Sequence, residues 1–390
     1  MNVLLLGSGG RESALAWALS RSRAVSSLVA APGNPGIAQT ADLVDVDIED
    51  PRAVVDAAHA VDAGLVVVGP EAPLVAGVAD ALRAAGRRVF GPDASAALVE
   101  GSKAHAKQLM ERAGVPTAAW RSFEDAADAV AHLDEIGPPY VVKADGLASG
   151  KGVVVTEDRE EAAEAARASL VAGRFGDAGR RVLIEEFLDG QEASLIALTD
   201  GAAVLVCEPA QDYKRVLDDD RGPNTGGMGS YSPVPALPPE PSARIVDEIV
   251  EPMVAASRAS GAPFVGALYA GLALTARGPR VLEFNARFGD PETQSLLPRL
   301  RSDLGEVCLA CASGDAQGYA LEWSPQACVC LVLAAAGYPG AYEEGTPIEG
   351  VEDAAAMDRV EVFHSGTARR GGDLVTAGGR VLAVSALGDG

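Results

Sequence analysis

Basic residues are scarce in this chain: 32 lysines and arginines stand against 55 aspartates and glutamates, a formal net charge of −23 over 390 residues. An exterior of that sign repels nucleic acid and anionic membranes, so neither is expected as a partner. A small anionic substrate can still bind where arginines, lysines and backbone N–H groups cluster. The composition therefore favours small-molecule chemistry.

Cysteine and histidine are also few, with five and four residues. An odd, scattered set of cysteines provides no disulfide framework and predicts reduced thiols. The short apolar run at the N-terminus has no basic leader before it, so a cytoplasmic location is expected. Cys308 with Cys311 and Cys328 with Cys330 have the spacing of zinc ligands, but they fall in helix and strand patterns where cysteine serves as a small hydrophobe. The sequence shows no Ser-His or Cys-His signature of the kind that activates a protein nucleophile.

Long apolar runs are missing as well, since no segment reaches the roughly 18 residues that a membrane span needs. The length predicts about two to four domains. Alternating apolar runs and helical patterns predict an α/β, Rossmann-like domain with a parallel sheet over residues 1–102, including one helix over residues 72–85. Residues 103–316 form a second unit with a smaller mobile lobe at about 120–188, and residues 317–390 a β-rich unit. The Gly- and Pro-rich segment 218–235 is predicted to lack regular structure and to be functional.

Gly7, Gly9 and Gly10 lie where the first strand turns into a helix, and the N–H groups there can meet an anion. A dinucleotide fingerprint fails, because its third glycine is replaced by Glu12 and no acidic residue follows the second strand. A structural turn and a phosphate or substrate site remain, and Arg11 favours the second.

GLASGKG (146–152) resembles a Walker A loop with the wrong count, since Asp145 stands six positions before Lys151. A glycine-rich hairpin remains that can cover phosphates, with Lys143 as a fixed positive charge beside it. A plain surface hairpin is the alternative. In IEEFLDGQE (184–192), the backbone from Glu185 to Leu188 can pair with an adenine edge and Glu192 with ribose, although solvated acids at a strand end are common.

LEFNARFGDPETQ (282–294) carries the strongest signal. In an extended strand Glu283, Asn285 and Arg287 project to one face, which suits a hard cation held jointly with phosphate oxygens. A guanidinium beside that cation fits phosphoryl transfer. A structural ion-pair strand is the alternative. QDYKR (211–215) by itself is a solvated face, but the glycine-rich PNTGGMG behind it favours an anion-binding wall.

Together these tracts, with GSKA, GYPG and FHSGT, resemble the phosphoribosylamine–glycine ligases of the ATP-grasp superfamily over essentially the whole chain. The resemblance implies an N-terminal α/β domain, a two-lobed ATP-grasp domain and a C-terminal β-rich domain. It implies that ATP, glycine and 5-phosphoribosylamine react through a glycyl phosphate, with Mg²⁺, or alternatively Mn²⁺, as the metal. A monomer or weak homo-oligomer is expected.

The resemblance also implies roles for individual residues. Catalysis is expected from Lys143, Asp212 and Arg287, and metal binding from Glu283 and Asn285. The nucleotide is expected on Lys103, Lys143, Gly146, Ser149, Gly150, Lys151, Gly152, Glu185, Glu186, Phe187, Leu188 and Glu192. The acceptor substrates are expected on Gly9, Gly10, Arg11, Gly33, Asn34, Lys214, Asn224, Thr225, Gly226, Gly227, Asp290 and Glu292.

Three positions depart from the family's usual residues: Ser13 and Tyr213 stand where histidine is frequent, and Ala286 where cysteine is frequent. The end after ALG is shorter than usual, so we expect a truncated β-rich domain with an exposed edge. Three other functions are alternatives: another ATP-grasp carboxylate ligase, a nucleotide-binding sensor and a dehydrogenase. PNTGGMG and GDPETQ argue against the first, the intact Lys143, Glu283 and Asn285 against the second, and the missing third glycine against the last.

Overall fold

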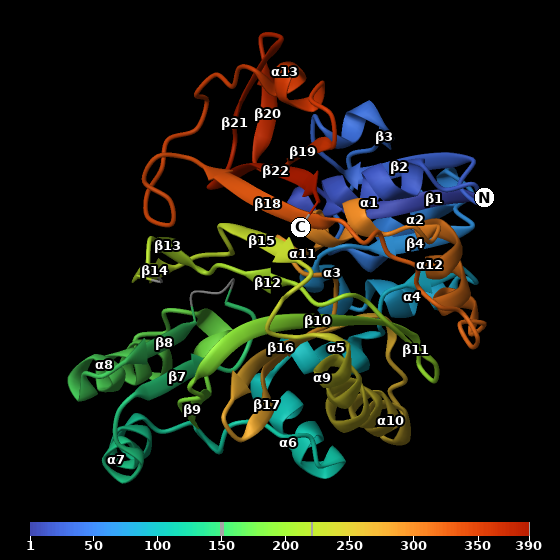
Figure 1. Ribbon diagram of the computed structural model, residues 1–390. Helices are drawn as coiled ribbons and strands as arrows, with labels where there is room; N and C mark the ends of the chain where they lie inside the picture. The colour runs from blue at the N-terminus through green and yellow to red at the C-terminus, as the bar shows by residue number, and fades with distance from the viewer. Residues whose placement is uncertain (149–151, 220, 390) are drawn as a thin grey trace.

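The computed structural model describes residues 1–148, 152–219 and 221–389, and its N-terminal unit is the predicted parallel sheet. The strands run in the order β3-β2-β1-β4-β5 and are all parallel (Figure 1). They are β1 (Asn2–Gly7), β2 (Ser27–Pro32), β3 (Asp42–Leu43), β4 (Leu65–Val68) and β5 (Val89–Phe90). The apolar runs of β1 and β4 are buried, as expected for a sheet with helices on its faces. β3 and β5 have two residues each, too few for a sequence pattern.

Five helices and one short 3₁₀ turn belong to this unit. They are α1 (Gly10–Ser20), η1 (Ile37–Gln39), α2 (Pro51–Ala60), α3 (Glu71–Val75), α4 (Val78–Ala84) and α5 (Ala94–Gly101). The prediction of one helix over residues 72–85 is wrong. Gly77, with φ at +85°, adopts the left-handed conformation and separates α3 from α4.

The lobe predicted near residues 120–188 is a four-stranded sheet in the order β6-β9-β7-β8. It consists of β6 (Trp120–Phe123), α7 (Ala126–Ile136), β7 (Tyr140–Ala144), β8 (Val153–Thr156), α8 (Arg159–Leu170), η2 (Gly176–Gly179) and β9 (Val182–Glu186). Asp125 and Asp158 cap the two helices by accepting backbone N–H groups. The lobe has a hydrophobic core of its own, around Leu133 and Ile184. A separate core would let the lobe move as a unit, and its mobility stays a prediction.

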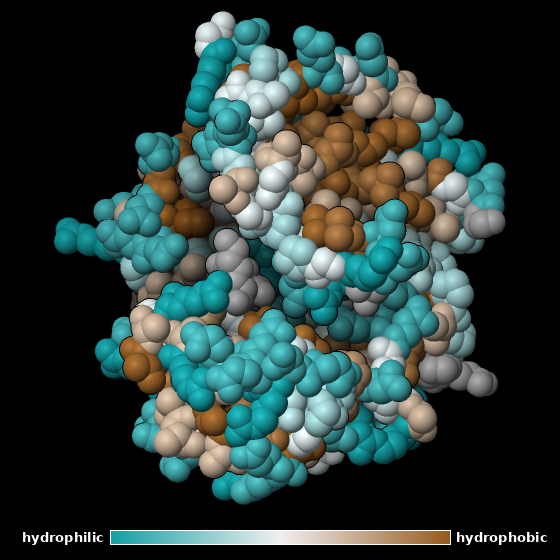
Figure 2. Space-filling model, turned by 90° about the vertical axis from the view of Figure 1, so that its left-hand side faces the viewer, coloured by the Kyte–Doolittle hydropathy of each residue, from teal (hydrophilic) through white to brown (hydrophobic). Residues whose placement is uncertain are grey.

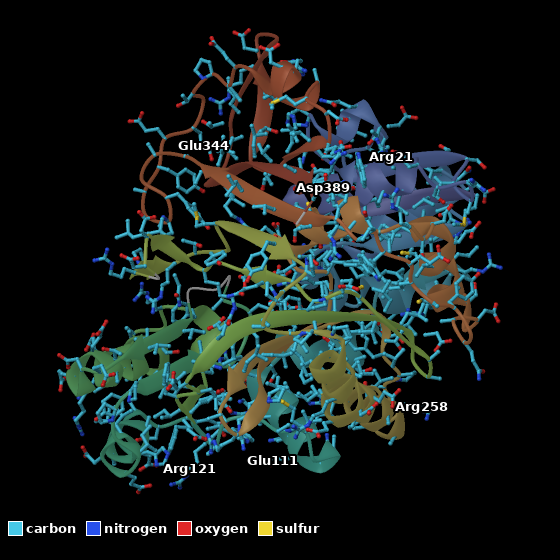
Figure 3. All side chains as sticks on the ribbon, in the orientation of Figure 1. Arg21, Glu111, Arg121, Arg258, Glu344 and Asp389 are labelled. Atoms are coloured by element: carbon cyan, nitrogen blue, oxygen red, sulfur yellow. The ribbon has the colours of Figure 1, made fainter. Side chains whose placement is uncertain are left out.

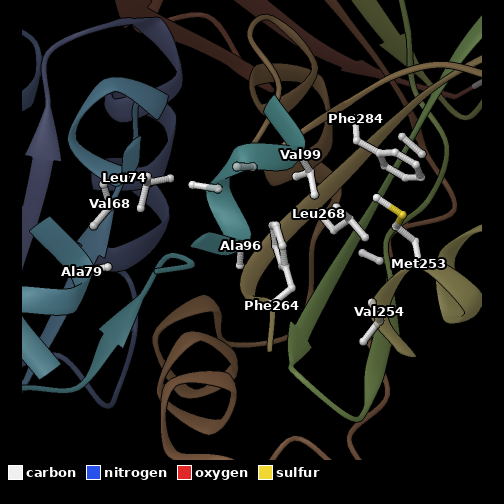
Figure 4. Close-up of a cluster of buried hydrophobic side chains, with 14 of the residues drawn as sticks. Val68, Leu74, Ala79, Ala96, Val99, Met253, Val254, Phe264, Leu268 and Phe284 are labelled. Carbon is white, nitrogen blue, oxygen red and sulfur yellow. The ribbon is translucent and has the colours of Figure 1, made fainter. Parts of the chain in front are cut away.

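The larger of the two four-stranded sheets is antiparallel, has the order β11-β10-β16-β17 and supports the predicted metal-binding motif. Its strands are β10 (Gly190–Asp200), β11 (Val204–Val206), β16 (Val265–Thr275) and β17 (Gly278–Asn285). The helices around it are α6 (Lys103–Ala113), α9 (Pro239–Ile245), the π-helical turn η3 (Val246–Val250), α10 (Glu251–Ala259), α11 (Glu292–Leu296), η4 (Leu297–Arg299) and α12 (Leu304–Ser313). Figure 4 shows that Phe264, Leu268 and Phe284 share one core with Leu74 and Val99 of the N-terminal unit. The two units therefore form one packed frame.

The C-terminal sheet has the order β12-β15-β18-β22-β19. Its elements and the nearby hairpins are β12 (Gln211–Asp212), β13 (Arg215–Leu217), β14 (Arg221–Asn224), β15 (Gly229–Ser232), β18 (Ala327–Ala334), α13 (Val351–Ala355), β19 (Val360–His364), β20 (Thr367–Arg370), β21 (Asp373–Thr376) and β22 (Arg380–Gly388). The prediction that segment 218–235 lacks regular structure is wrong. Its backbone is paired in two places, since β15 lies against the distant β18, and β14 forms a hairpin with the adjacent β13. This sheet joins strands on both sides of the predicted boundary at residue 316.

The exterior carries both charged and apolar side chains. Charged side chains such as Arg121, Arg258 and Glu344 lie at the periphery of the molecule (Figure 3). The upper part of Figure 2 also shows an apolar area, and Val329, Leu331 and Leu333, which alternate along β18, are exposed.

All five cysteines are buried free thiols, with Cys308 and Cys311 in α12 and Cys328 and Cys330 in β18. No helix among the described residues is both long enough and apolar enough to cross a membrane.

Candidate active site

One large cavity of about 1380 Å³ lies between the lobe, the larger sheet and the C-terminal unit. On the side shown in Figure 2 the surface is hollowed between the upper and lower parts of the molecule. Its walls contain most of the predicted site residues: Arg11, Lys103, Lys143, Gly152, Glu185, Glu186, Phe187, Leu188, Glu192, Asp212, Lys214, Asn224, Thr225, Gly226, Glu283, Asn285, Arg287, Asp290 and Glu292. Residues separated by up to 281 positions therefore meet in one space.

Lys143, on β7, is held by a buried carboxylate. Its Nζ lies 3.0 Å from Glu185 Oε2 and donates to the carbonyl of Leu282 at 3.2 Å. Lys107, on α6, lies 3.0 Å from the same Glu185 oxygen, and both Lys107 and Glu185 are 2% exposed. Burial alone would raise the pKa of Glu185, but Lys143 and Lys107 outweigh it and hold that pKa below its ordinary value. Glu185 is therefore an ionised anchor for two lysines.

The other nucleotide-binding predictions surround this anchor. Lys103, at the start of α6, donates to the Gly146 carbonyl at 3.3 Å, which connects that lysine to the glycine-rich hairpin. A Cβ on Gly146 would lie 2.7 Å from Ala178 Cβ, and one on Gly152 2.7 Å from Ala148 Cβ, so both positions need glycine for close packing. Ser149, Gly150 and Lys151 lie outside the described residues.

Glu283 and Asn285 both project from β17 into the cavity. Burial would raise the pKa of Glu283, but Lys214, Lys103 and Lys143 together hold it below its ordinary value. An ionised carboxylate and an amide oxygen on one strand face are the donors that Mg²⁺ and Mn²⁺ accept, so these residues fit a divalent cation. Lys143 and Glu283 thus share one cavity, as the predicted chemistry requires.

Arg287 follows this strand and is fixed by two carboxylates that the sequence patterns did not reveal. Its Nη2 lies 2.9 Å from Glu100 Oε1 and its Nε 3.3 Å from Glu71 Oε2. Burial raises the pKa of Glu100, with Arg287 acting in the opposite direction. The backbone N–H of Ala286 also donates to Glu100 at 2.7 Å. This network holds the guanidinium at the cavity wall without need of a substrate.

A second polar cluster lies on β10, β12 and β16. Burial raises the pKa of Asp212 to about 7, against the opposing effect of Lys214. Lys214 Nζ lies 3.1 Å from Glu192 Oε2, the carboxylate predicted to contact ribose. Glu292 accepts hydrogen bonds from Ser194 Oγ and Tyr269 OH, both at 2.9 Å. The cluster offers carboxylates that can receive an ammonium group.

The predicted acceptor residues near the N-terminus divide into two groups. Arg11 lines the cavity, with its Nε 2.5 Å from Glu12 Oε1. Gly9 lines a neighbouring smaller cavity. Asn34, by contrast, is buried and uses its side chain internally, donating to the carbonyls of Ser8 and His364 and accepting from Gly36 and Ile37. Gly10, Gly33 and Asn34 line neither cavity, so the geometry gives no support to their predicted contact with the acceptor substrates.

The last acceptor residues are connected through Arg380, a residue that the motifs did not include. Arg380 Nη2 lies 3.2 Å from Asp290 Oδ2, and its Nη1 donates to the carbonyls of Asp290, Gly226 and Gly227. Burial would raise the pKa of Asp290, but Arg380 and Arg11 outweigh it and hold that pKa low. Of the cavity residues that the sequence patterns did not identify, Lys107 could have been predicted, because it lies one helical turn after Lys103. The positions of Glu71, Glu100 and Arg380 could not be predicted from local patterns, since tertiary packing alone brings these residues to the cavity.

Comparison with known proteins identifies the family. The sequence models of the phosphoribosylglycinamide synthetase N domain, ATP-grasp (A) domain and C domain match residues 1–100, 101–293 and 328–390. The chain is 53% identical over 390 residues to the phosphoribosylamine–glycine ligase of Rhizobium meliloti (strain 1021), covering 100% of this chain and 91% of that protein. It is 50% identical over 395 residues to the enzyme of that name from Rhodopirellula baltica, covering 100% and 90%.

Solved structures agree. The phosphoribosylamine–glycine ligase of Thermotoga maritima matches with a TM-score of 0.86 and 33% identity, covering 100% of this chain and 93% of that one. The biotin carboxylase domain of a Hydrogenobacter thermophilus 2-oxoglutarate carboxylase has a TM-score of 0.74, 18% identity and coverage of 100% and 86%, a likeness in fold alone. From these matches over its whole length, the chain belongs to the phosphoribosylamine–glycine ligase family of ATP-grasp enzymes.

Proposed function

We propose that this chain joins glycine to 5-phosphoribosylamine through a glycyl phosphate, within the large cavity. The ATP-dependent ligase activity and its place in purine biosynthesis follow from the family. The main support for the proposed residue roles is that Lys143 and Glu283 line the same cavity, where nearby lysines lower the pKa of Glu283. Phosphate-binding cations and metal-binding oxygens can therefore act on one nucleotide.

The nucleotide would lie between the lobe and β17. Lys103, Lys143 and the hairpin 146–152 would bind its phosphates, the backbone from Glu185 to Leu188 its adenine edge, and Glu192 its ribose. Glu283 and Asn285 would hold Mg²⁺ or Mn²⁺, which when bound neutralises charge on the transferring phosphate. Because Lys143 is already fixed by Glu185, little reorganisation is needed when the nucleotide binds.

The chemistry balances without a protein nucleophile. A glycine carboxylate oxygen attacks the γ-phosphorus, the bond to ADP breaks, and glycyl phosphate forms. The amine of phosphoribosylamine then attacks the glycyl carbonyl carbon and phosphate leaves, while the amine loses one proton. Arg287, fixed by Glu71 and Glu100, would stabilise the transferring phosphoryl group, and Asp212 would hold the glycine ammonium. A monomer or weak homo-oligomer in the cytoplasm is the setting that we propose.

The test is ADP release in reactions that each omit one component. With Mg²⁺-ATP, glycine and freshly made phosphoribosylamine, we expect release that needs both substrates. Glu283→Ala should lower the rate by about 10³-fold or more, since it removes a metal ligand and a fixed charge. Glu164→Ala, which removes an exposed carboxylate on α8, should retain the normal rate. ADP release that is unchanged when glycine is omitted would contradict the proposed function.

A further inference from the structure

The ion pair between Glu192 and Lys214 joins two residues that are expected to bind different substrates. Glu192 Oε2 lies 3.1 Å from Lys214 Nζ, and both side chains line the large cavity. Glu192 is the residue expected to contact the ribose of the nucleotide, whereas Lys214 is expected to contact an acceptor substrate. Neither side chain has a second ion-pair partner in the part of the chain that the structure describes. The pair therefore connects the two predicted halves of the site.

The backbones that carry this pair are fixed, while the two charged ends can be reached from the cavity. Glu192 lies in the ladder between β10 and β16, opposite Ala273. The Lys214 carbonyl accepts hydrogen bonds from the backbone N–H and the hydroxyl of Thr225, at 2.7 and 2.8 Å. The side chains of Lys214 and Glu192 are nevertheless 34% and 49% exposed. The two charged groups can therefore exchange partners without a change in the backbone.

The charges around Lys214 suit a zwitterionic amino acid. Burial would lower the pKa of Lys214, but its acidic neighbours, Asp212 foremost, hold that pKa well above its ordinary value. The side chain is therefore an ammonium group beside the carboxyl group that we assign to the ammonium of glycine. Glycine carries its carboxylate one carbon away from its ammonium, so Lys214 and Asp212 can bind its two ends. Glu192 competes with the glycine carboxylate for the same lysine.

Ribose hydroxyls offer Glu192 another partner. A carboxylate accepts hydrogen bonds on both oxygens, so one that receives the neighbouring 2′- and 3′-hydroxyls uses Oε2 as well as Oε1. We propose that ribose binding transfers Glu192 from Lys214 to the nucleotide, and that the released ammonium then binds the glycine carboxylate. Glu192 is thus a positioning residue that makes each substrate tighten the binding of the other. This inference rests on the proposed function and adds to it a coupling between two of its substrates.

The experiment compares the affinity for glycine at saturating Mg²⁺-ADP and at saturating Mg²⁺-2′,3′-dideoxy-ADP, which differs only in lacking the two ribose hydroxyls. Calorimetric titration of the full chain measures both dissociation constants without turnover. We expect glycine to bind the unaltered chain at least about fivefold more tightly with ADP. In Glu192→Gln the two nucleotides should give affinities equal within twofold, because no carboxylate holds Lys214. Glu164→Gln, which removes an exposed carboxylate on α8 outside the cavity, should retain the fivefold difference.

Equal glycine affinities with the two nucleotides in the unaltered chain would overturn the inference. A fivefold difference that persists in Glu192→Gln would also overturn it, since a purely structural role for Glu192 changes both affinities and leaves their ratio unaltered. If Glu192→Gln does not bind ADP, glycine is titrated alone. The variant should then bind glycine at least fivefold more tightly than the unaltered chain, and equal or weaker binding counts against the exchange.

Failure of this inference and failure of the proposed function give different results. Glycine-dependent ADP release together with glycine binding that ignores the ribose hydroxyls would refute the coupling and keep the ligase chemistry. No glycine binding to the unaltered chain, with or without nucleotide, would refute both.

Discussion

The buried group formed by Lys107, Glu185 and Lys143 provides a quantitative test of how the proposed nucleotide site is held together. Both lysines lie 3.0 Å from the same carboxylate oxygen, and Glu185 and Lys107 are 2% exposed. At an effective dielectric constant of about 20, each contact is worth roughly 5 kcal/mol before desolvation, which removes much of that value. The two ammonium groups are at most about 6 Å apart, so without Glu185 they would repel each other by roughly 3 kcal/mol.

These magnitudes predict unequal effects on the free energy of unfolding. Lys107→Met leaves the Lys143–Glu185 pair intact and should cost about 2 kcal/mol, below the usual cost of breaking a buried pair. Glu185→Gln leaves two buried ammonium groups facing each other and should cost about 4 kcal/mol or more. In the double variant only one ammonium remains, so we expect a cost of about 4 kcal/mol, roughly 2 kcal/mol less than the sum of the single variants.

Urea denaturation followed by tryptophan fluorescence measures the four proteins. The pH dependence provides a second readout. Burial lowers the pKa of Lys107 from 10.5 to about 8, so between these values the unfolded chain holds a proton that the folded chain has released. Stability contributed by this group should therefore rise with pH from about 8 to 10.5, and Lys107→Met should lack that rise. If the losses in unfolding free energy of the two single variants add up to that of the double variant within about 0.5 kcal/mol, the coupling through Glu185 is refuted.

Two further predictions concern the cavity. Burial raises the pKa of Asp212 to about 7, so kcat/KM for glycine should rise as the pH increases through 7. The Asp212→Asn enzyme should be slower, and its kcat/KM should not rise over this pH range. Steady-state kinetics of the two enzymes as a function of pH measure these effects. Mg²⁺-ATP should protect Lys103 and Lys143 from an amine-reactive reagent, as measured by mass spectrometry. The amine of Met1, which precedes β1 and does not line the cavity, should react equally in both samples. Equal labelling of the two lysines with and without nucleotide would count against the phosphate assignment.

The sequence predicted the features of the fold that depend on local patterns and not those that depend on distant residues. The buried runs of β1 and β4 and the alternation around Glu283 and Asn285 are local, so the parallel sheet and the shared face of β17 could be predicted. β15 could not, because its strand character comes from pairing with β18 almost a hundred residues later. The same holds for Arg287, whose partner Glu100 is 187 positions away and is supplied by a different unit. Local patterns identify donors, whereas the folded chain decides which donors already have partners.

Asn34 is a residue that the sequence identified as a ligand and that has a different role in the structure. Its position in a turn near the first glycines made it a reasonable ligand, yet its amide is fully engaged in holding the turn to His364 of the C-terminal unit. The amide therefore has a structural role that no motif reveals. A sequence pattern can therefore identify a polar side chain without showing whether other parts of the chain already occupy its hydrogen-bonding groups.

The distribution of lysine explains how so acidic a protein can hold two phosphorylated substrates. The chain has only five lysines, at positions 103, 107, 143, 151 and 214. Lys103, Lys107, Lys143 and Lys214 all line the large cavity, and Lys151 belongs to the glycine-rich hairpin predicted to cover the phosphates. Elsewhere the basic residues are arginines, which make exposed ion pairs such as Arg159 with Asp134. A compact ammonium group can approach phosphate oxygens from any direction, whereas a guanidinium requires a planar partner. The cavity walls also carry carboxylates such as Glu185 and Glu192, which hold Lys107, Lys143 and Lys214 in place. Binding of phosphate there would therefore depend on where each ammonium group is fixed, and not on the overall charge of −23.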